Sequence, residues 1–218
     1  MSQSTLIDRS IAFVKEKLQN AEGGHDWFHI ERVYKNALLI AQEEHDIDLV
    51  VIQLGALLHD IADSKFHNGD ETVGPRVARA FLEQENTAPE TIDHVVKIIE
   101  NISYKGGNFE KKFNSKELDI VQDADRLDAI GAIGIARAFN YGGFKDRAIY
   151  DPSIEPQLSM TKEEYKKSTA PTITHFYEKL LLLKDKMNTE TGKKIALARH
   201  QYMEGFLNQF YAEWNGEK

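Results

Sequence analysis

Apolar residues recur every three or four positions along almost the whole chain, and no stretch alternates between apolar and polar residues as a half-buried strand does. This spacing predicts amphipathic helices, so we expect an all-α fold of eight or nine helices. In the first half of the chain, the expected helices run along Ile7 to Leu18, with a stop at Gly23-Gly24, along Ile30 to Ile40, over about 48–63, and along Val73 to Phe81. A fifth helix opens at Pro89, and a sixth covers about 116–140. The next helix follows a capping box at Thr161 and Glu164 and has Pro171 in its first turn, and the last helix ends near Trp214.

These helices are expected to form one compact domain over residues 1–218. The connections are short, and no low-complexity linker separates one part of the chain from another. We expect the core of the bundle over about 20–150, with the C-terminal helices of 160–215 packed onto it. The stretch 143–160 contains two prolines and is long enough to be a functional loop.

The composition excludes several kinds of site. The chain has no cysteine, so it has neither disulfides, nor thiolate metal ligands, nor a cysteine nucleophile. Its 27 basic and 35 acidic residues give a net charge of −8, which disfavours nucleic acid as a partner. No apolar run approaches the ~20 residues that span a bilayer, and no signal peptide is evident at the N-terminus, so we expect a cytoplasmic protein that does not enter a membrane. The eight histidines are then the natural nitrogen ligands for a metal.

Histidines and aspartates occur at positions where the helical pattern calls for core residues. His59 continues the apolar stripe of Ile52 and Ala56, and Asp60 follows it directly. His29 is aligned with Val33 and Ile40 on the preceding helix, and Asp125 continues the apolar line of Leu118 and Val121. Taken singly, each of these residues is most simply a hydrogen-bonded core residue or a helix terminus. Because buried polar groups need partners, three helices that each send such groups inward indicate a shared site.

Two imidazoles and two carboxylates, from His29, His59, Asp60 and Asp125, suit a divalent metal with mixed nitrogen and oxygen preference. Four protein ligands leave two positions of an octahedral ion open for water and a substrate oxygen. That arrangement is what metal-assisted hydrolysis of a phosphoryl group requires. We expect Mn²⁺ or Mg²⁺, with Co²⁺, Ni²⁺, Fe²⁺ or Zn²⁺ as alternatives.

The order H, HD, D and its flanking residues resemble the HD superfamily of metal-dependent phosphohydrolases, in particular its stand-alone bacterial members. The matching segments are Gly24 to Val33 (GHDWFHIERV), Ala56 to Ile61 (ALLHDI) and Val121 to Asp128 (VQDADRLD). The resemblance implies an all-α HD-domain bundle that hydrolyses phosphate esters or anhydrides, with nucleotides such as nucleoside triphosphates or monophosphates as substrates. It also implies metal ligation by His29, His59, Asp60 and Asp125. Members with two metals have further histidines before the last aspartate, whereas this chain has only His67 and His94 there, so we expect one ion.

Other residues are candidates for roles around this site. Asp63 and His25 are candidate catalytic residues, Asp63 because it lies one turn after His59, where it could orient or deprotonate the attacking water. Arg32 and Arg126 neighbour the ligands and could pair with carboxylates such as Asp26 or Asp128 in the surroundings of the metal. The structural alternatives are an exposed carboxylate at the helix end for Asp63 and a role at the helix start for His25. For Lys65 and Lys105, a solvated surface position is the simpler alternative. The candidates for binding substrate phosphates are Lys65, Lys105, Arg32, Arg126 and Arg147.

Three functions remain open at this stage. The leading one is a phosphohydrolase in which a metal-activated water attacks a phosphorylated small molecule. The sequence leaves the oligomeric state of this enzyme undefined. The second is a non-catalytic nucleotide or metal sensor that keeps the ligands without turnover. The third is a helical interaction module in which the inward histidines and aspartates only pair with each other.

Overall fold

The computed structural model describes residues 3–19, 26–62, 70–102, 113–159, 161, 164 and 168–218. Within these residues the chain forms nine α-helices and one 3₁₀ helix and no strand, which confirms the all-α prediction. It divides into two compact units, Met1–Asp125 and Arg126–Lys218, which meet in sequence inside one helix. The packing of 160–215 onto 20–150 stays a prediction. None of the described helices is long and apolar enough to cross a membrane, and the expected cytoplasmic location stays a prediction.

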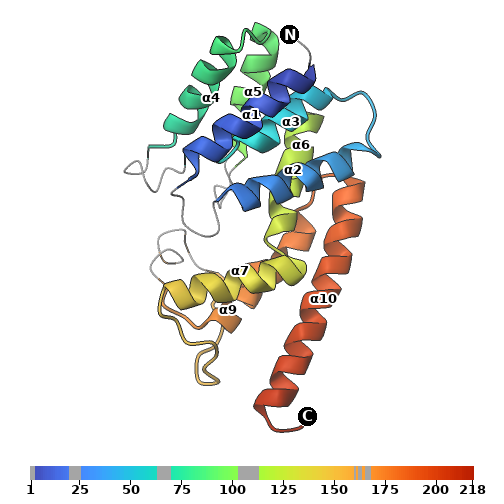
Figure 1. Cartoon of the computed structure of the whole chain (residues 1–218). Coiled ribbons are helices and arrows are strands. Elements are labelled where there is room, and N and C mark those ends of the chain that lie inside the picture. The colour runs from blue at the N-terminus through green and yellow to red at the C-terminus, as the bar shows by residue number, and fades with distance from the viewer. Residues whose placement is uncertain are drawn as a thin grey trace. The chain divides into compact units, whose positions relative to one another are not determined.

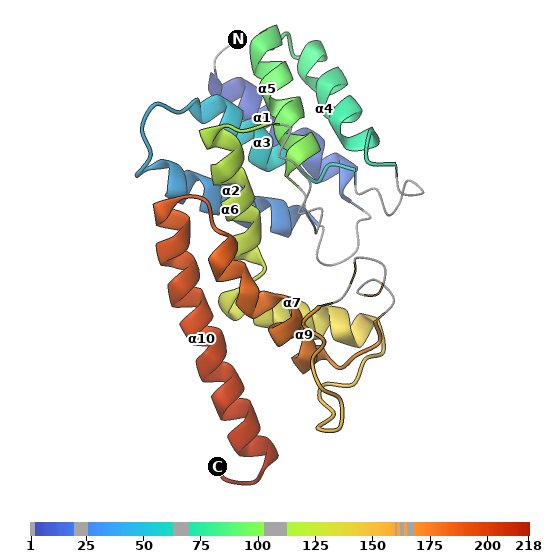
Figure 2. The ribbon, with the colours of Figure 1, turned by 180° about the vertical axis from the view of Figure 1, so that it is seen from behind.

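The first unit is built around one apolar helix, α3. Its residues Leu54, Leu57 and Leu58 are completely buried, and α1, α2 and α5 all pack against it. α4 and α5 run side by side (Figures 1 and 2) and stack their apolar faces on each other. The helices of this unit are α1 (Gln3–Lys17), α2 (Trp27–Ala41), α3 (Leu49–Leu58), α4 (Val73–Gln84), α5 (Pro89–Asn101) and α6 (Lys116–Asp128), of which α6 continues into the second unit.

Local capping chemistry sets where several of these helices begin. Asp48 accepts hydrogen bonds from the amides of Val50 and Val51 at the start of α3, and Pro89 occupies the first turn of α5, where its missing N–H costs nothing. Ser115 accepts from the amide of Leu118 at the start of α6. The capping box at Thr161 and Glu164 is present, with each side chain bonded to the backbone amide of the other.

Two predicted helices are shorter than expected. The helix predicted over 48–63 ends at Leu58, so His59 and Asp60 lie in the turn that follows α3. The helix predicted over 116–140 is wrong as a single element, because it breaks after Asp128. Ile130 is extended, and Gly131, the first residue of the next helix, has φ of +73°, a left-handed conformation that the interior of one continuous right-handed helix does not accommodate. The chain therefore continues as two helices, α6 and α7 (Gly131–Phe144).

The second unit packs its apolar residues around a group of aromatic rings. Phe176 is completely buried and stacks on Phe206, while Phe139 contacts both rings. Residues 145–159 contain no regular helix, as expected for the stretch 143–160. Apart from the end of α6, the elements of this unit are α7, α9 (Thr172–Glu178), the 3₁₀ helix η2 (Leu180–Lys186) and α10 (Glu190–Trp214).

Gly134 occupies a position with no room for a side chain. A Cβ atom there would lie 2.3 Å from the carbonyl oxygen of Ala129, which belongs to the backbone and cannot rotate away. We therefore expect Gly134→Ala to lower the free energy of unfolding by about 3 kcal/mol. Gly205 of α10 is the matched control, because a Cβ atom there would meet no atom within 4 Å. Gly205→Ala is expected to stabilise by about 0.5–1 kcal/mol, and urea denaturation of both variants measures the difference. Equal free energies of unfolding for Gly134→Ala and Gly205→Ala would contradict the close contact at Gly134.

His175 of α9 is a half-buried histidine that is neutral at pH 7. Burial lowers its pKa to about 3, with Lys179 and Arg147 adding to the shift. In the unfolded chain the pKa is about 6.5, so between pH 6.5 and 3 the unfolded state binds more protons. The stability that neutral His175 contributes is thus complete above pH 6.5 and is lost as the pH falls through this window.

We expect this loss to reach about 2 kcal/mol between pH 6.5 and 5. Urea denaturation at both pH values should show a smaller loss for His175→Gln than for the wild type. The control is His45→Asn, because His45 is exposed, and this variant should keep the wild-type pH dependence. The same pH dependence in all three proteins would contradict the assignment.

Candidate metal centre

His29 enters the site from the first turn of α2. Asp26 caps this helix by accepting a hydrogen bond from the backbone amide of His29, at 3.0 Å. The same helix buries Ile30, Val33 and Ile40 completely in the first unit. His29 itself is only 2% exposed. The cap and the apolar face of α2 therefore hold its imidazole inside the fold.

His59 is presented by the turn that ends α3. Its Nδ1 lies 2.9 Å from the carbonyl oxygen of Ala56. Because a carbonyl only accepts, Nδ1 is the protonated nitrogen of the neutral ring, and in that tautomer Nε2 has the lone pair. That Nε2 is buried and has no hydrogen-bond partner among the described residues. A buried nitrogen acceptor without a donor costs free energy unless something binds it, and this is the expected state of a metal-ligating histidine whose other nitrogen is fixed by a carbonyl.

Asp125 reaches the same place from α6. The buried side chain of Asn36 ties α6 to α2, because its Nδ2 donates to the carbonyl oxygen of Ala124, the residue before Asp125. Gln122 donates to the carbonyl oxygen of Asn101 at the end of α5. The carboxylate of Asp125 remains 39% exposed, in contrast to the two histidines. One side of the cluster is thus open to a ligand from solution.

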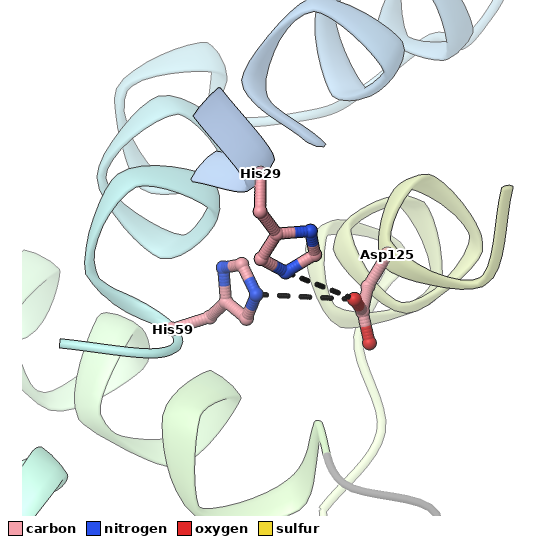
Figure 3. Close-up of side chains that lie close together, drawn as sticks. All are labelled: His29, His59 and Asp125. Atoms are coloured by element: carbon pink, nitrogen blue, oxygen red, sulfur yellow. Dashed lines mark ion pairs between the residues drawn. The ribbon is translucent and has the colours of Figure 1, made fainter. Parts of the chain in front are cut away.

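The three side chains point toward one another from three different elements (Figure 3). Asp125 Oδ1 lies 3.6 Å from His29 Nε2 and 3.9 Å from His59 Nε2, and the three donor atoms lie within 4.8 Å of each other. These separations are too long for hydrogen bonds. A divalent ion with ligand bonds of about 2.0–2.2 Å fits between atoms spaced in this way. The donor set therefore suits a metal such as those expected from the sequence.

Not every expected site residue is placed in this cluster. Asp60 is half-buried in the turn beside His59, and among the described residues the cluster of close donor atoms consists of His29, His59 and Asp125. Ligation by Asp60 stays a prediction. Four of the other expected residues lie outside the described residues, namely His25, Asp63, Lys65 and Lys105.

The expected arginines have the following surroundings. Arg32 is half-buried on α2, one turn beyond His29. In the second unit, Arg126 donates to the carbonyl oxygen of Lys186. Arg147 donates to the carbonyl oxygen of Ser168 and lies over the ring of Tyr141. The phosphate-binding roles of these three arginines stay predictions.

The two carboxylates expected near the ligands have the following partners, and their pairing with Arg32 or Arg126 stays a prediction. Asp26 caps α2 through the amide of His29, as described above. Asp128 forms an ion pair with Arg137 of α7, a residue that the sequence analysis did not single out. Asn36 was not expected at the site either, although the sequence carries a signal for it: Asn36 is a polar residue seven positions after His29 on the same face of the helix.

Comparison with known proteins identifies relatives over almost the whole chain. The HD domain family model matches residues 27–130. The uncharacterized protein YpgQ of Bacillus subtilis (strain 168) is 36% identical over 200 residues, which are 90% of this chain and 88% of that protein.

Solved structures show the same relationship. An HD-superfamily hydrolase from Bacillus thuringiensis is 42% identical with a TM-score of 0.78, and the match covers 98% of this chain and 99% of that one. A Lactobacillus plantarum protein is 35% identical with a TM-score of 0.81, over 99% of this chain and all of that one. Bacillus subtilis YpgQ in complex with ADP is 31% identical with a TM-score of 0.75, over 98% and 97% of the two chains.

Proposed function

Because this chain belongs to the HD superfamily, we propose that it is a metal-dependent phosphohydrolase that cleaves a phosphate ester or anhydride bond of a nucleotide. The observation that carries the proposal is the cluster of His29, His59 and Asp125, in which the buried Nε2 of His59 has no hydrogen-bond partner among the described residues. A helical module that only pairs these groups with each other would bring them to hydrogen-bond distance. At 3.6 and 3.9 Å they are not.

We assign the metal to His29, His59 and Asp125, with Asp60 as the proposed fourth ligand, and we propose a single divalent ion. When bound, such an ion supplies Lewis-acid polarisation of a phosphoryl oxygen and lowers the pKa of water. Mn²⁺ and Mg²⁺ are the preferred candidates, because a set that includes carboxylates suits these ions.

The residues of the chain have separate roles in this proposal. The carbonyl of Ala56 holds the proton on Nδ1 of His59, so Nε2 stays available to a cation. The carboxylate of Asp125 offsets the positive charge of the cation. Because its side chain is partly exposed, an anionic substrate can approach the cation from solution. The net charge of −8 disfavours binding of such a substrate elsewhere on the chain. We further propose that Asp63 orients or deprotonates the attacking water, that His25 is a catalytic residue that contacts the substrate, and that Lys65 and Lys105 hold phosphate oxygens.

A nucleotide is the proposed substrate. The related YpgQ of Bacillus subtilis has been solved in complex with ADP, which supports binding of a nucleotide in this branch of the family. Within that class we favour nucleoside triphosphates and monophosphates.

The test is turnover of a nucleotide panel by the purified protein. Nucleoside mono-, di- and triphosphates with Mn²⁺, Mg²⁺, Co²⁺ or Ni²⁺ are followed by ³¹P NMR in ¹⁸O-labelled water, so that the labelled product identifies the phosphorus attacked. We expect release of phosphate or pyrophosphate that depends on the metal. Tight binding of nucleotide without any turnover would favour the non-catalytic sensor instead. A protein that neither binds nor cleaves any of these nucleotides with any of the four metals would contradict the proposal.

A further inference from the structure

The last turn of α6 is held by two arginines from other helices of the second unit. Asp128 is 1% exposed and forms an ion pair with Arg137 of α7. The same guanidinium donates to the backbone carbonyl of Asp128, at 3.2 Å. Arg199 of α10 donates to the carbonyl of Leu127. Burial lowers the pKa of Arg199, and the negative charge of Asp128 acts against this shift, which places the carboxylate within electrostatic reach of both cations.

These contacts cap the C-terminal end of α6. The final carbonyls of a helix lack partners within the helix, and positive charge is favourable at this end. In α6 the carbonyls of Leu127 and Asp128 accept hydrogen bonds from Arg199 and Arg137. The last turn of α6 is thus fixed by side chains from α7 and α10.

Gly131 allows one of the arginines to approach. With φ of +73° it turns the chain sharply after α6, and a Cβ atom at this position would lie 3.0 Å from both Cβ and Cγ of Arg199. The backbone conformation and the space both favour glycine here. The turn after α6 and the path of Arg199 therefore depend on each other.

A role beyond stability follows from where this network lies. Buried ion pairs add little net stability, because the cost of desolvating the charges offsets their attraction. Their better attested effect is to fix one arrangement of the groups around them. Asp125 is three residues before Asp128 on the same helix, about 4.5 Å along its axis. Any change in the last turn of α6 therefore reaches the Asp125 carboxylate directly.

We propose that Asp128, held by Arg137 and Arg199, is a positioning residue that fixes the last turn of α6 and so aims the Asp125 carboxylate at the metal. This inference rests on the proposed metal site. It assigns Asp128 no contact with the metal or the substrate. Removing its charge should change the affinity and geometry of metal binding in protein that is still folded.

The test is Co²⁺ titration followed by visible absorption, because the d–d bands of Co²⁺ report on the geometry of its ligands. Asp128→Asn removes the charge and keeps the shape. The control is Phe176→Leu, which disturbs the buried aromatic core of the same unit, where Phe176 packs on Phe139 and Phe206. Circular dichroism sets a temperature at which all the proteins are folded. We expect Asp128→Asn to weaken Co²⁺ binding about tenfold and to alter the bands, whereas Phe176→Leu should lower the melting temperature only.

Arg137→Lys is the second variant, because it keeps the charge but loses the planar fork of the guanidinium. If Asp128→Asn does not fold, Arg137→Lys carries the test, with a weaker change in the same direction. Wild-type affinity and spectrum in a folded, less stable variant would overturn the positioning role and leave the metal site intact. A wild-type protein that binds no Co²⁺ would overturn the metal site and this inference together.

Discussion

Replacing Asp125 with asparagine should lower kcat/KM for nucleotide hydrolysis by about a thousandfold. Asp125 is the anionic member of the cluster, with Oδ1 3.6 Å from His29 and 3.9 Å from His59. Asparagine keeps the shape of the side chain and removes the charge that offsets the cation. Loss of the several kcal/mol that a metal contributes to the transition state corresponds to a factor of this size. The measurement is steady-state kinetics on the substrate that the nucleotide panel identifies, together with the metal content of the variant.

The control for Asp125 is Asp93→Asn. Asp93 is an exposed aspartate of α5 that pairs with Arg79 on the surface, so its charge should not affect turnover. We expect Asp93→Asn to keep wild-type kinetics. If Asp125→Asn keeps a third or more of wild-type activity, Asp125 is not a ligand on which the reaction depends.

Removal of the metal should abolish activity and destabilise the fold. A ligand that binds only the native state at 100 times its Kd adds about 2.7 kcal/mol. For a chain of this size, that corresponds to roughly 5–10 °C in Tm. We therefore expect treatment with a chelator, followed by dialysis, to eliminate turnover and to lower Tm by this amount. Adding Mn²⁺ back should restore both.

Variants at the histidines make this prediction specific to the site. His59→Ala removes the buried Nε2 that lacks a hydrogen-bond partner, so the Tm of this variant should not respond to Mn²⁺. His45→Asn changes an exposed histidine and should keep the wild-type response. A chelated wild-type protein that keeps its activity, or a His59→Ala variant that Mn²⁺ still stabilises, would contradict the assignment.

Features that depend on a few neighbouring residues could be predicted from the sequence. The stripe of Ile30, Val33 and Ile40 predicts α2, and all three side chains are completely buried. Pro89 is a local signal for the start of α5, and that prediction is confirmed. The cap of α6 by Ser115 depends in the same way on residues that are close in sequence. The same periodicity predicts that His29 and His59 point inward, because an imidazole that replaces a core residue in a stripe inherits its direction.

Features that depend on a single backbone angle or on distant residues could not be predicted in this way. Apolar spacing continues across Ile130 and Gly131, so the pattern does not reveal the break at Gly131, where φ is +73°. In one continuous helix Asp128 and Arg137 would be nine residues apart and on opposite faces. The break is what allows them to meet. The contact of Arg199 with the end of α6 joins residues 72 positions apart in sequence, for which the chain carries no local signal.

The most direct test of the central claim is to count the nitrogen ligands of the bound metal. Pulsed EPR on the Mn²⁺-loaded protein detects the ¹⁴N nuclei of coordinated imidazoles. The site of His29, His59 and Asp125 predicts two such nitrogens in the wild type, one in His29→Gln, one in His59→Gln, and two in His45→Asn. A spectrum of bound Mn²⁺ with no nitrogen coupling, or one that both site variants leave unchanged, would contradict it.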